Sequence, residues 1–371
     1  MSKRLPTPLP LWDELFPLLI ARWRKLMKLP AGPIDRLQTR EFRSLIEHLQ
    51  NYKKEKDLSS VESLGSYFLY DWPLYYAQAL SLLKELPSPP SNVLDITIGG
   101  SPCALAALQH GATTVFALGP NERALRLTAD LTGHLGYPVS IRCIDPLQFR
   151  SFPEEKQWDL IILSHSLLDL LPSLEEQIPY LQKILSLLSP QGHLLLVEDS
   201  VSEINRSLLT LRDRLVELGA SIAAPCLWKG MCPALKSNSL CFAQRPFDKP
   251  FLIKEIQRAS HINLSSLKMS YLLLRSPAAK PPEFSSSLYR IVSPPVATFL
   301  GDRFFLCGVR GKKTLGSRLE QHPKHSKAFE YLKRGDVISI EQAAEREDDL
   351  EVTSQTKLTL FAPCDKPVPG S

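Results

Sequence analysis

The sequence lacks an apolar run long enough to cross a membrane. Its richest apolar stretch, LIILSHSLLDLL, is interrupted by His165 and Asp169, whereas a spanning helix needs about 20 consecutive apolar residues. The N-terminal stretch has basic residues and an apolar face, but it contains Asp13 and Glu14 and has no small-residue cleavage site. We therefore expect no membrane association and no secretory signal, while a mitochondrial presequence stays open.

The sequence also lacks a Cys-x-x-Cys pair, and its cysteines are odd in number, seven in 371 residues. A chain of this length can bury a sizeable core without disulfides, since 44% of its residues are hydrophobic. These features do not describe a secreted disulfide framework. They indicate a reducing compartment, in which the thiols are free to bind a metal.

Positive charge is in small excess, with a formal net charge of +5. This balance is compatible with nucleic-acid binding without demonstrating it, and many enzymes share it. Between residues 301 and 340 bases outnumber acids, and that excess can contact a phosphate backbone. The alternative is an ordinary solvated face. The candidate basic residues are Arg303, Arg310, Lys312, Lys313, Arg318, Lys333 and Arg334.

Strand-like and helix-like segments alternate along the middle of the chain. VLDIT, TTVFALG, VSIRCID, WDLIILS and HLLLVED read as strands, and amphipathic stretches such as 202–218 read as helices. This alternation predicts an α/β fold with a doubly wound, mostly parallel, Rossmann-type sheet. We divide the chain into a helical N-terminal region (1–88), the α/β domain (89–225), a cysteine loop with a returning segment (226–275), a basic β-rich region (276–340) and a disordered tail (341–371).

A glycine-rich turn, VLDITIGGSP, follows the first strand of the α/β domain. In a methyltransferase domain this turn reads acidic-x-Gly-x-Gly-x-Gly, which lets the backbone approach S-adenosyl-L-methionine (AdoMet). Asp95 and Gly99 fit that pattern, and Gly100 adds freedom one residue off register. Thr97 and Ser101 replace the flanking glycines. The turn therefore predicts a cofactor pocket with weakened chemistry.

Other positions around this predicted pocket depart from the methyltransferase pattern. Gly119 ends the second strand, where an acid would bond the ribose hydroxyls. Asp145, after the third strand, could still meet the adenine amine. SHSLLDL stands where a base-amine methyltransferase has Asn/Asp-Pro-Pro-aromatic, and Cys103 is a candidate nucleophile by adjacency alone. No catalytic residue is identified.

Three cysteines, Cys226, Cys232 and Cys241, lie within sixteen residues of a loop rich in proline and other turn formers. Such a loop can wrap its thiols around a common centre. Thiolates are soft ligands that suit zinc or an iron–sulfur cluster. A fourth ligand could come from Cys307 in RFFLCGVRG. The alternative is that these are ordinary buried cysteines.

Several segments together resemble the ribosomal small-subunit assembly family with a methyltransferase-like domain, which occurs in mitochondria and bacteria. They are DWPLYYAQALSLLKELP, VLDITIGGSP, WDLIILSHSLLDL, LLLVEDS, APC…CP…CFAQ, MSYLLLRSP, YRIVSPP, FFLCGVRGKKT and SKAFEYLKRGDVI, and they cover roughly residues 60–340. The cysteine loop followed by a distant Leu-Cys strand is the most specific of these features.

The resemblance implies a 4Fe–4S cluster on four cysteines, with zinc as the alternative metal. The matching positions are Cys226, Cys232, Cys241 and Cys307. Leu227-Trp228 stands where Pro-His usually follows the first ligand, and the third ligand is spaced slightly differently. A histidine beside the ligands is therefore lost, which affects cluster stability or potential. Cys103, Cys143 and Cys364 match no ligand position.

The resemblance also implies partners and a compartment. We expect an iron–sulfur assembly factor that binds the small ribosomal subunit and its rRNA, as a monomer, with or without AdoMet. We expect the bacterial cytoplasm, with the mitochondrial matrix as the alternative. Two other functions stay open, namely an active AdoMet-dependent rRNA methyltransferase and a zinc-stapled RNA-binding protein without activity.

Overall fold

The computed structural model describes residues 10–149, 152, 157–318 and 329–364. The chain forms two compact units, each built from separate stretches of sequence. The first comprises Met1–Leu83, Pro89–Ser166 and Pro246–Leu267, and the second comprises Lys84–Ser88, Leu167–Arg245 and Lys268–Ser371. Among the described residues, no helix combines the length and the apolar content that crossing a bilayer requires.

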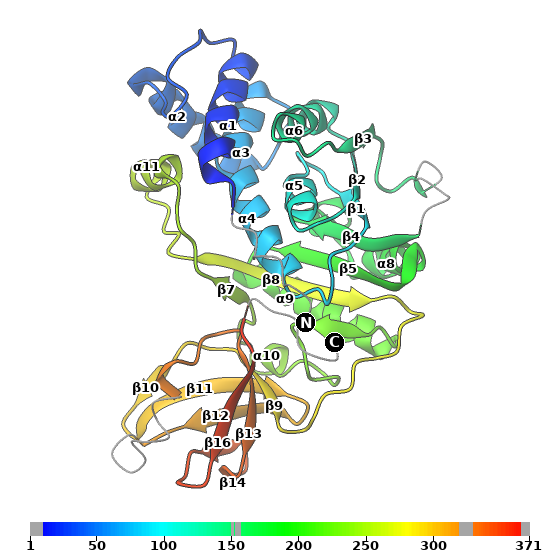
Figure 1. The fold of residues 1–371 in the computed structure, drawn as a ribbon, viewed down its shortest axis with the longest axis vertical. Coiled ribbons are helices and arrows are strands. Elements are labelled where there is room, and N and C mark those ends of the chain that lie inside the picture. The colour runs from blue at the N-terminus through cyan, green and yellow to red at the C-terminus, as the bar shows by residue number, and fades with distance from the viewer. Residues whose placement is uncertain (1–9, 150–151, 153–156, 319–328, 365–371) are drawn as a thin grey trace. The chain divides into compact units, whose positions relative to one another are not determined.

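The N-terminal part of the first unit is helical, as the sequence predicts (Figure 1). Its helices are α1 (Trp12–Leu26), α2 (Thr39–Glu55), α3 (Val61–Leu69) and α4 (Asp71–Leu83). Leu15, Leu19 and Trp23 of α1 are buried on one face, because residues spaced by three and four lie on one side of a helix. The Ser60 side chain accepts the N–H of Ser63 and so caps the start of α3.

A parallel sheet forms the rest of the first unit. Its strands are β1 (Asn92–Ile96), β2 (Thr114–Gly119), β3 (Ser140–Cys143) and β4 (Trp158–Ser164), in the order β3-β2-β1-β4. Val93 of β1 pairs with Val115 on one side and with Leu160 on the other. The strand order thus reverses direction at β1, which defines a doubly wound sheet and places its switch point there. The predicted fold class is confirmed.

Helices connect these strands. They are α5 (Pro102–Gln109), which leads from β1 to β2, and α6 (Glu122–His134), which leads from β2 to β3; α11 (Phe251–Ser260) returns to this unit later in the chain. Asn121 caps α6 by accepting the N–H of Ala124 at 3.0 Å. The turns before α5 and α6 therefore lie at the carboxyl ends of β1 and β2, where α/β proteins bind ligands.

The second unit continues the α/β alternation. Its elements before the C-terminal sheet are α7 (Leu167–Leu170), α8 (Leu174–Ser186), β5 (Leu188–Glu198), α9 (Ser202–Glu217), β6 (Ile222–Ala224), α10 (Pro233–Lys236), β7 (Ala243–Arg245) and β8 (Leu267–Arg275). Strand β8 is antiparallel to both β5 and β6, and it also pairs with β7. The cysteine loop leaves this sheet after β6 and returns to it at β7.

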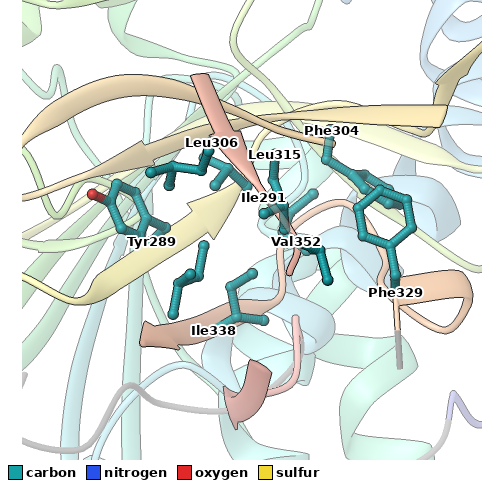
Figure 2. Close-up of a cluster of buried hydrophobic side chains, with 10 residues drawn as sticks. Tyr289, Ile291, Phe304, Leu306, Leu315, Phe329, Ile338 and Val352 are labelled. Carbon is teal, nitrogen blue, oxygen red and sulfur yellow. The ribbon is translucent and has the colours of Figure 1, made fainter. Parts of the chain in front are cut away.

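The C-terminal sheet of the second unit has its own core. Its strands are β9 (Leu288–Ile291), β10 (Val296–Thr298), β11 (Gly301–Gly308), β12 (Gly311–Gly316), β13 (Val337–Glu341), β14 (Ala344–Arg346), β15 (Asp349–Glu351) and β16 (Lys357–Ala362). The order is β14-β15-β12-β11-β9-β13-β16, with β10 paired to β11. Figure 2 shows the buried cluster that includes Ile291, Leu306 and Ile338. The Phe304 and Phe329 rings meet edge to face, with centroids 4.9 Å apart.

The expectation of a disordered tail from residue 341 is wrong for the described residues up to 364. Strands β14, β15 and β16 lie there, and Leu350 of β15 pairs with Leu315 of β12. Leu350 and Val352 are buried in the core of Figure 2. The acidic composition concealed these alternating apolar residues. Residues 365–371 lie outside the described part, and the other domain boundaries stay predictions.

Candidate metal centre

The four cysteines singled out in the sequence lie around one cavity. Cys226, Cys232 and Cys241 come from the loop between β6 and β7, and Cys307 comes from β11. All four line a cavity of about 240 Å³ within the second unit. Strand β11 places Cys307 by pairing it with Lys312 of β12 and with Arg290 of β9. Residues far apart in the sequence thus line one cavity, and their role as metal ligands stays a prediction.

Burial and nearby thiols make Cys226, Cys241 and Cys307 hard to ionise. Burial, followed by charge repulsion from Cys226 and Cys232, raises the pKa of Cys241 to about 12. Burial and the three other thiols likewise raise the pKa of Cys307 well above its ordinary value. Both shifts favour the protonated thiols of Cys241 and Cys307. A bound metal would replace those protons, because thiolate is the form that ligates metals.

Helix α9 holds the cysteine loop through polar side chains on its buried face. The Asn205 amide donates to the Cys241 carbonyl at 2.7 Å, and its Oδ1 accepts the Cys241 N–H at 3.2 Å. Both carboxylate oxygens of Asp213 accept the Cys232 N–H at 2.9 Å. Two of the cysteine backbones are therefore fixed by one helix.

Arg212 fixes the first part of the same loop. Its guanidinium is 1% exposed, donates to Asp213 Oδ1 at 2.6 Å, and also donates to the carbonyls of Trp228 and Gly230. A buried cation of this kind must be paired and hydrogen-bonded to be tolerated. Arg212 therefore ties Asp213, and through it Cys232, to the turn that follows Cys226.

Sequence reasoning missed Asn205, Arg212 and Asp213. A signal was present, because Asn205 and Arg212 are seven residues apart and share a face with the apolar Leu208 and Leu215. Polar side chains within a buried apolar stripe need hydrogen-bond partners. Here the partners are the backbone groups of the cysteine loop.

Two further arginines lie beside the thiols. Arg290 and Arg334 line a smaller cavity of about 50 Å³ together with Cys226, Cys241 and Cys307. Arg290 is held by Glu85 at 3.4 Å and by the Gly335 carbonyl at 2.9 Å. Buried positive charge of this kind favours an anionic group, such as a metal centre bound by several thiolates. The donor set and its surroundings therefore fit a thiolate-bound metal centre.

The arrangement of donors is wide. Among the described residues, no group of three or more His, Cys, Asp or Glu side chains converges closely enough to hold a single metal ion. The four thiols instead surround the cavity at its walls. A group bound by all four cysteines would therefore have to be larger than a single metal ion, or the loop would have to contract around the ion.

The glycine turn after β1 looks different from the cysteine loop. Asp95 is 1% exposed and accepts a hydrogen bond from the Ser101 hydroxyl, and burial raises its pKa to about 7. The N–H of Gly99 donates to Thr97 Oγ1 at 3.0 Å, and the N–H of Gly100 donates to Tyr67 Oη at 3.2 Å. The backbone donors that would cradle AdoMet are thus already bonded within the protein, and the residues present do not fit that cofactor.

The remaining candidates for AdoMet chemistry also have internal roles. Asp145 is exposed and accepts the N–H of Leu147 at 3.0 Å within its own turn. Cys103 is fully buried, and burial raises the pKa of its thiol well above the ordinary value. The His165 ring stacks on Tyr75 with centroids 3.7 Å apart. The contact predicted between Asp145 and adenine stays a prediction.

The model of one protein family matches residues 64–329, which is more than two thirds of the chain. The chain belongs to the mitochondrial small ribosomal subunit Rsm22 family. The stretch that matches Rsm22 contains the glycine turn and all four cysteines of the cavity. No similar protein was found among curated proteins.

Solved structures similar to this Rsm22-family chain include methyltransferases. The N-methyltransferase NodS from Bradyrhizobium japonicum WM9 is 15% identical with a TM-score of 0.37, over 55% of this chain and 97% of NodS. A ribosomal protein L11 methylase from Lactobacillus delbrueckii subsp. bulgaricus is 16% identical with a TM-score of 0.34, over 55% and 77%. TrmK from M. capricolum, in complex with S-adenosyl-homocysteine, is 10% identical with a TM-score of 0.34, over 55% and 70%.

Acids of the C-terminal sheet pair with most of the basic residues singled out in the Rsm22-family chain. Arg310 pairs with Glu345 at 2.8 Å, and Lys313 pairs with Glu345 and Asp348 at 3.2 and 3.3 Å. Glu351 similarly lies 3.1 Å from Arg303 and 3.7 Å from Arg318. The segment expected to be a tail thus neutralises part of the basic surface.

The other three basic residues have different surroundings. Arg334 is partly buried, donates to the Val292 carbonyl at 2.6 Å and lies 3.8 Å from the centroid of the Phe242 ring. Lys312 lies 5.1 Å from the centroid of Phe305 and 3.5 Å from the Ser237 hydroxyl. Among the described residues, neither Lys312 nor Lys333 has a carboxylate within ion-pair distance.

Proposed function

We propose that this chain is an assembly factor that binds the small ribosomal subunit and carries an iron–sulfur cluster on four cysteines. The observation that carries the proposal is that Cys226, Cys232, Cys241 and Cys307 line one cavity beside buried arginines. Membership in a family whose description names the small ribosomal subunit supplies the partner.

The width of the cavity supports a cluster over zinc. A zinc ion holds each sulfur at about 2.3 Å, which places the sulfurs within about 4 Å of one another. Among the described residues no group of three or more His, Cys, Asp or Glu side chains could hold a metal ion, and the four cysteines line a cavity of about 240 Å³. A 4Fe–4S cluster has its four ligands at the corners of a larger body. When bound, it would tie the loop after β6 to strand β11, so its binding energy would also be folding energy.

The test is anaerobic purification of the full chain, followed by a visible spectrum and analysis of iron, sulfide and zinc. The Cys226→Ser and Cys307→Ser variants run beside it, and Cys143→Ser serves as control because Cys143 is exposed and lies in the other unit. We expect a brown protein whose iron and sulfide are lost in the first two variants and kept in the control. Zinc without iron would show that the site binds zinc and not a cluster. A folded protein without metal would contradict the proposed metal site.

We propose that rRNA is the part of the subunit that the chain contacts. Lys312 and Lys333 are the better candidates for phosphate contacts among the seven basic residues, because four of the others are paired with acids. Binding to small-subunit rRNA should weaken steeply as salt rises. Affinity that is insensitive to salt would contradict a contact made mainly through phosphates.

The family description also bears on the compartment in which the chain acts. The family's description names mitochondria, which supports the mitochondrial matrix. The bacterial cytoplasm, which the sequence favours, has no finding in its support. We therefore propose the mitochondrial matrix as the place of action.

A further inference from the structure

The glycine turn after β1 lies under aromatic side chains of the N-terminal helices. Tyr67 and Phe68 belong to α3 and Trp72 belongs to α4, and all three are at most 4% exposed. Their rings contact one another in sequence, since Tyr67 meets Phe68 edge to face at 5.7 Å and Phe68 stacks on Trp72 at 6.0 Å. These elements all belong to the first unit.

The aromatic side chains approach the turn so closely that a Cβ on either glycine would crowd them. A Cβ on Gly99 would lie 2.9 Å from Tyr67 Oη, and a Cβ on Gly100 would lie 3.0 Å from the Phe68 ring. Real Cβ atoms essentially never come closer than 3.0 Å to a neighbouring heavy atom. In a cofactor site the same glycines would leave room for the ligand.

Hydrogen bonds fasten the helices to the turn. Trp72 Nε1 donates to the Gly100 carbonyl at 3.0 Å and lies 3.1 Å from Thr128 Oγ1, which itself donates to that carbonyl. Tyr67 accepts the Gly100 N–H from the other side. Both polar groups of the Gly100 backbone are therefore satisfied by side chains, and a ligand would have to displace them.

At the end of β2 the backbone itself crowds the strand, although an open cavity of about 570 Å³ begins beyond it, lined by residues that include Leu58, Ile98 and Asn121. A Cβ on Gly119 would lie 2.0 Å from the Thr97 carbonyl oxygen, so the backbone leaves no room for a side chain. The acid that would bond a ribose cannot occupy this position. Beside it, the Asn121 amide donates to the Leu58 carbonyl at 3.2 Å, which holds the segment before α3 across the turn.

We infer that the glycine turn is a docking site for the chain's own helices α3 and α4, and that it does not bind AdoMet. The glycines that suggest a cofactor serve close packing between helices and sheet. The glycine turn is then part of the scaffold of the first unit. This inference deepens the proposed function, and it stands or falls independently of the metal at the cysteines.

The first experiment titrates the wild-type full chain with AdoMet by calorimetry, up to about 1 mM. We expect no saturable heat, and saturable binding would overturn the inference. Metal analysis of the same preparation is a separate readout, so failure of the iron–sulfur proposal can be told apart from failure here.

A second experiment tests the packing in the cofactor-free protein. Gly99→Ala should lower Tm by at least about 2 °C, because the new methyl group collides with Tyr67. Gly133→Ala is the matched control, since a Cβ there meets nothing within 4 Å. In the double variant Tyr67→Leu/Gly99→Ala, the glycine substitution should cost less than it does alone. An unchanged Tm for Gly99→Ala, or equal costs in both backgrounds, would overturn the docking role.

Discussion

The glycine turn after β1 and the cysteine loop after β6 both read as cofactor sites in the sequence, yet their interiors differ. The protein itself occupies the space over the glycine turn, where Tyr67 and Phe68 pack onto the backbone. The cysteines after β6 and on β11 instead line a cavity of about 240 Å³. The backbone donors of the glycine turn are bonded within the protein, whereas the cysteine thiols face a cavity. Motif and function are therefore separate properties of a site.

The comparison also shows what each region requires of its neighbours. Glycines that bind no ligand still allow close packing, because large side chains can lie directly on a backbone that has no Cβ. Thiols that line one cavity are costly to ionise together, because the charged forms repel one another. A bound metal would offset that cost, since it stabilises the thiolate form.

The largest effect that would sharpen this comparison is expected at Asp213. Asp213→Ala removes the acceptor of the Cys232 N–H and leaves the buried Arg212 without its carboxylate. Partners that orient metal ligands typically contribute 10–100-fold to affinity, so we expect metal loss to a chelator at roughly 10–100-fold lower concentration. Glu217→Ala is the control, because Glu217 is an exposed member of the same helix. Equal metal retention in both variants would show that the loop orders its own ligands.

A smaller effect is expected at the end of β2. Gly119→Ala forces a methyl group against the Thr97 carbonyl, and overpacking of this kind costs about 1–3 kcal/mol. Thermal unfolding should detect a fall in Tm of several degrees. The metal content of the folded protein should not change, since Gly119 and the cysteines belong to different units. A neutral substitution would mean that this strand end can open to admit a ligand.

The last prediction concerns pH. Burial raises the pKa of Asp95 to about 7 in the folded protein, whereas an unfolded aspartate has a pKa of about 3.9. The folded state thus favours the protonated acid, and this contribution to stability is complete below about pH 4 and lost as pH rises to about 7. The Tm of the wild type relative to Asp95→Asn should therefore fall between pH 4 and pH 7. Parallel pH profiles for the two proteins would contradict a buried, neutral Asp95.

Hydrophobic periodicity was enough to predict the α/β alternation, because each strand of the first unit is a short apolar run between amphipathic helices. The same reasoning failed for β14 to β16. Their core residues, such as Leu350 and Val352, stand singly among acids. Those acids pair across the sheet with Arg303 and Arg310. Cross-strand pairing of opposite charges stabilises a sheet without leaving a hydrophobic pattern in the sequence.

The four cysteines of the cavity could be singled out from the sequence because thiols are rare and chemically distinctive, and their role as ligands stays a prediction. The positioning role of Asn205 and Asp213 could not, because it depends on which backbone groups the loop presents to α9. Closure of the glycine turn was equally hidden. Loss of glycines at Thr97 and Ser101 suggested a weakened pocket, but only the position of Tyr67 relative to Gly100 shows what closes it.

The discontinuous make-up of the two units has a consequence for synthesis. The first unit is complete only with residues 246–267, and the second only with strands near the C-terminus. Neither unit can therefore finish folding when its first segments leave the ribosome. Cys307 lies 66 positions after Cys241, which corresponds to roughly 3–13 s at a translation rate of about 5–20 residues per second. During that interval Cys226, Cys232 and Cys241 have been synthesised, whereas Cys307 has not. A nascent chain of this kind is sensitive to oxidants and to competing metals at one defined stage of its synthesis.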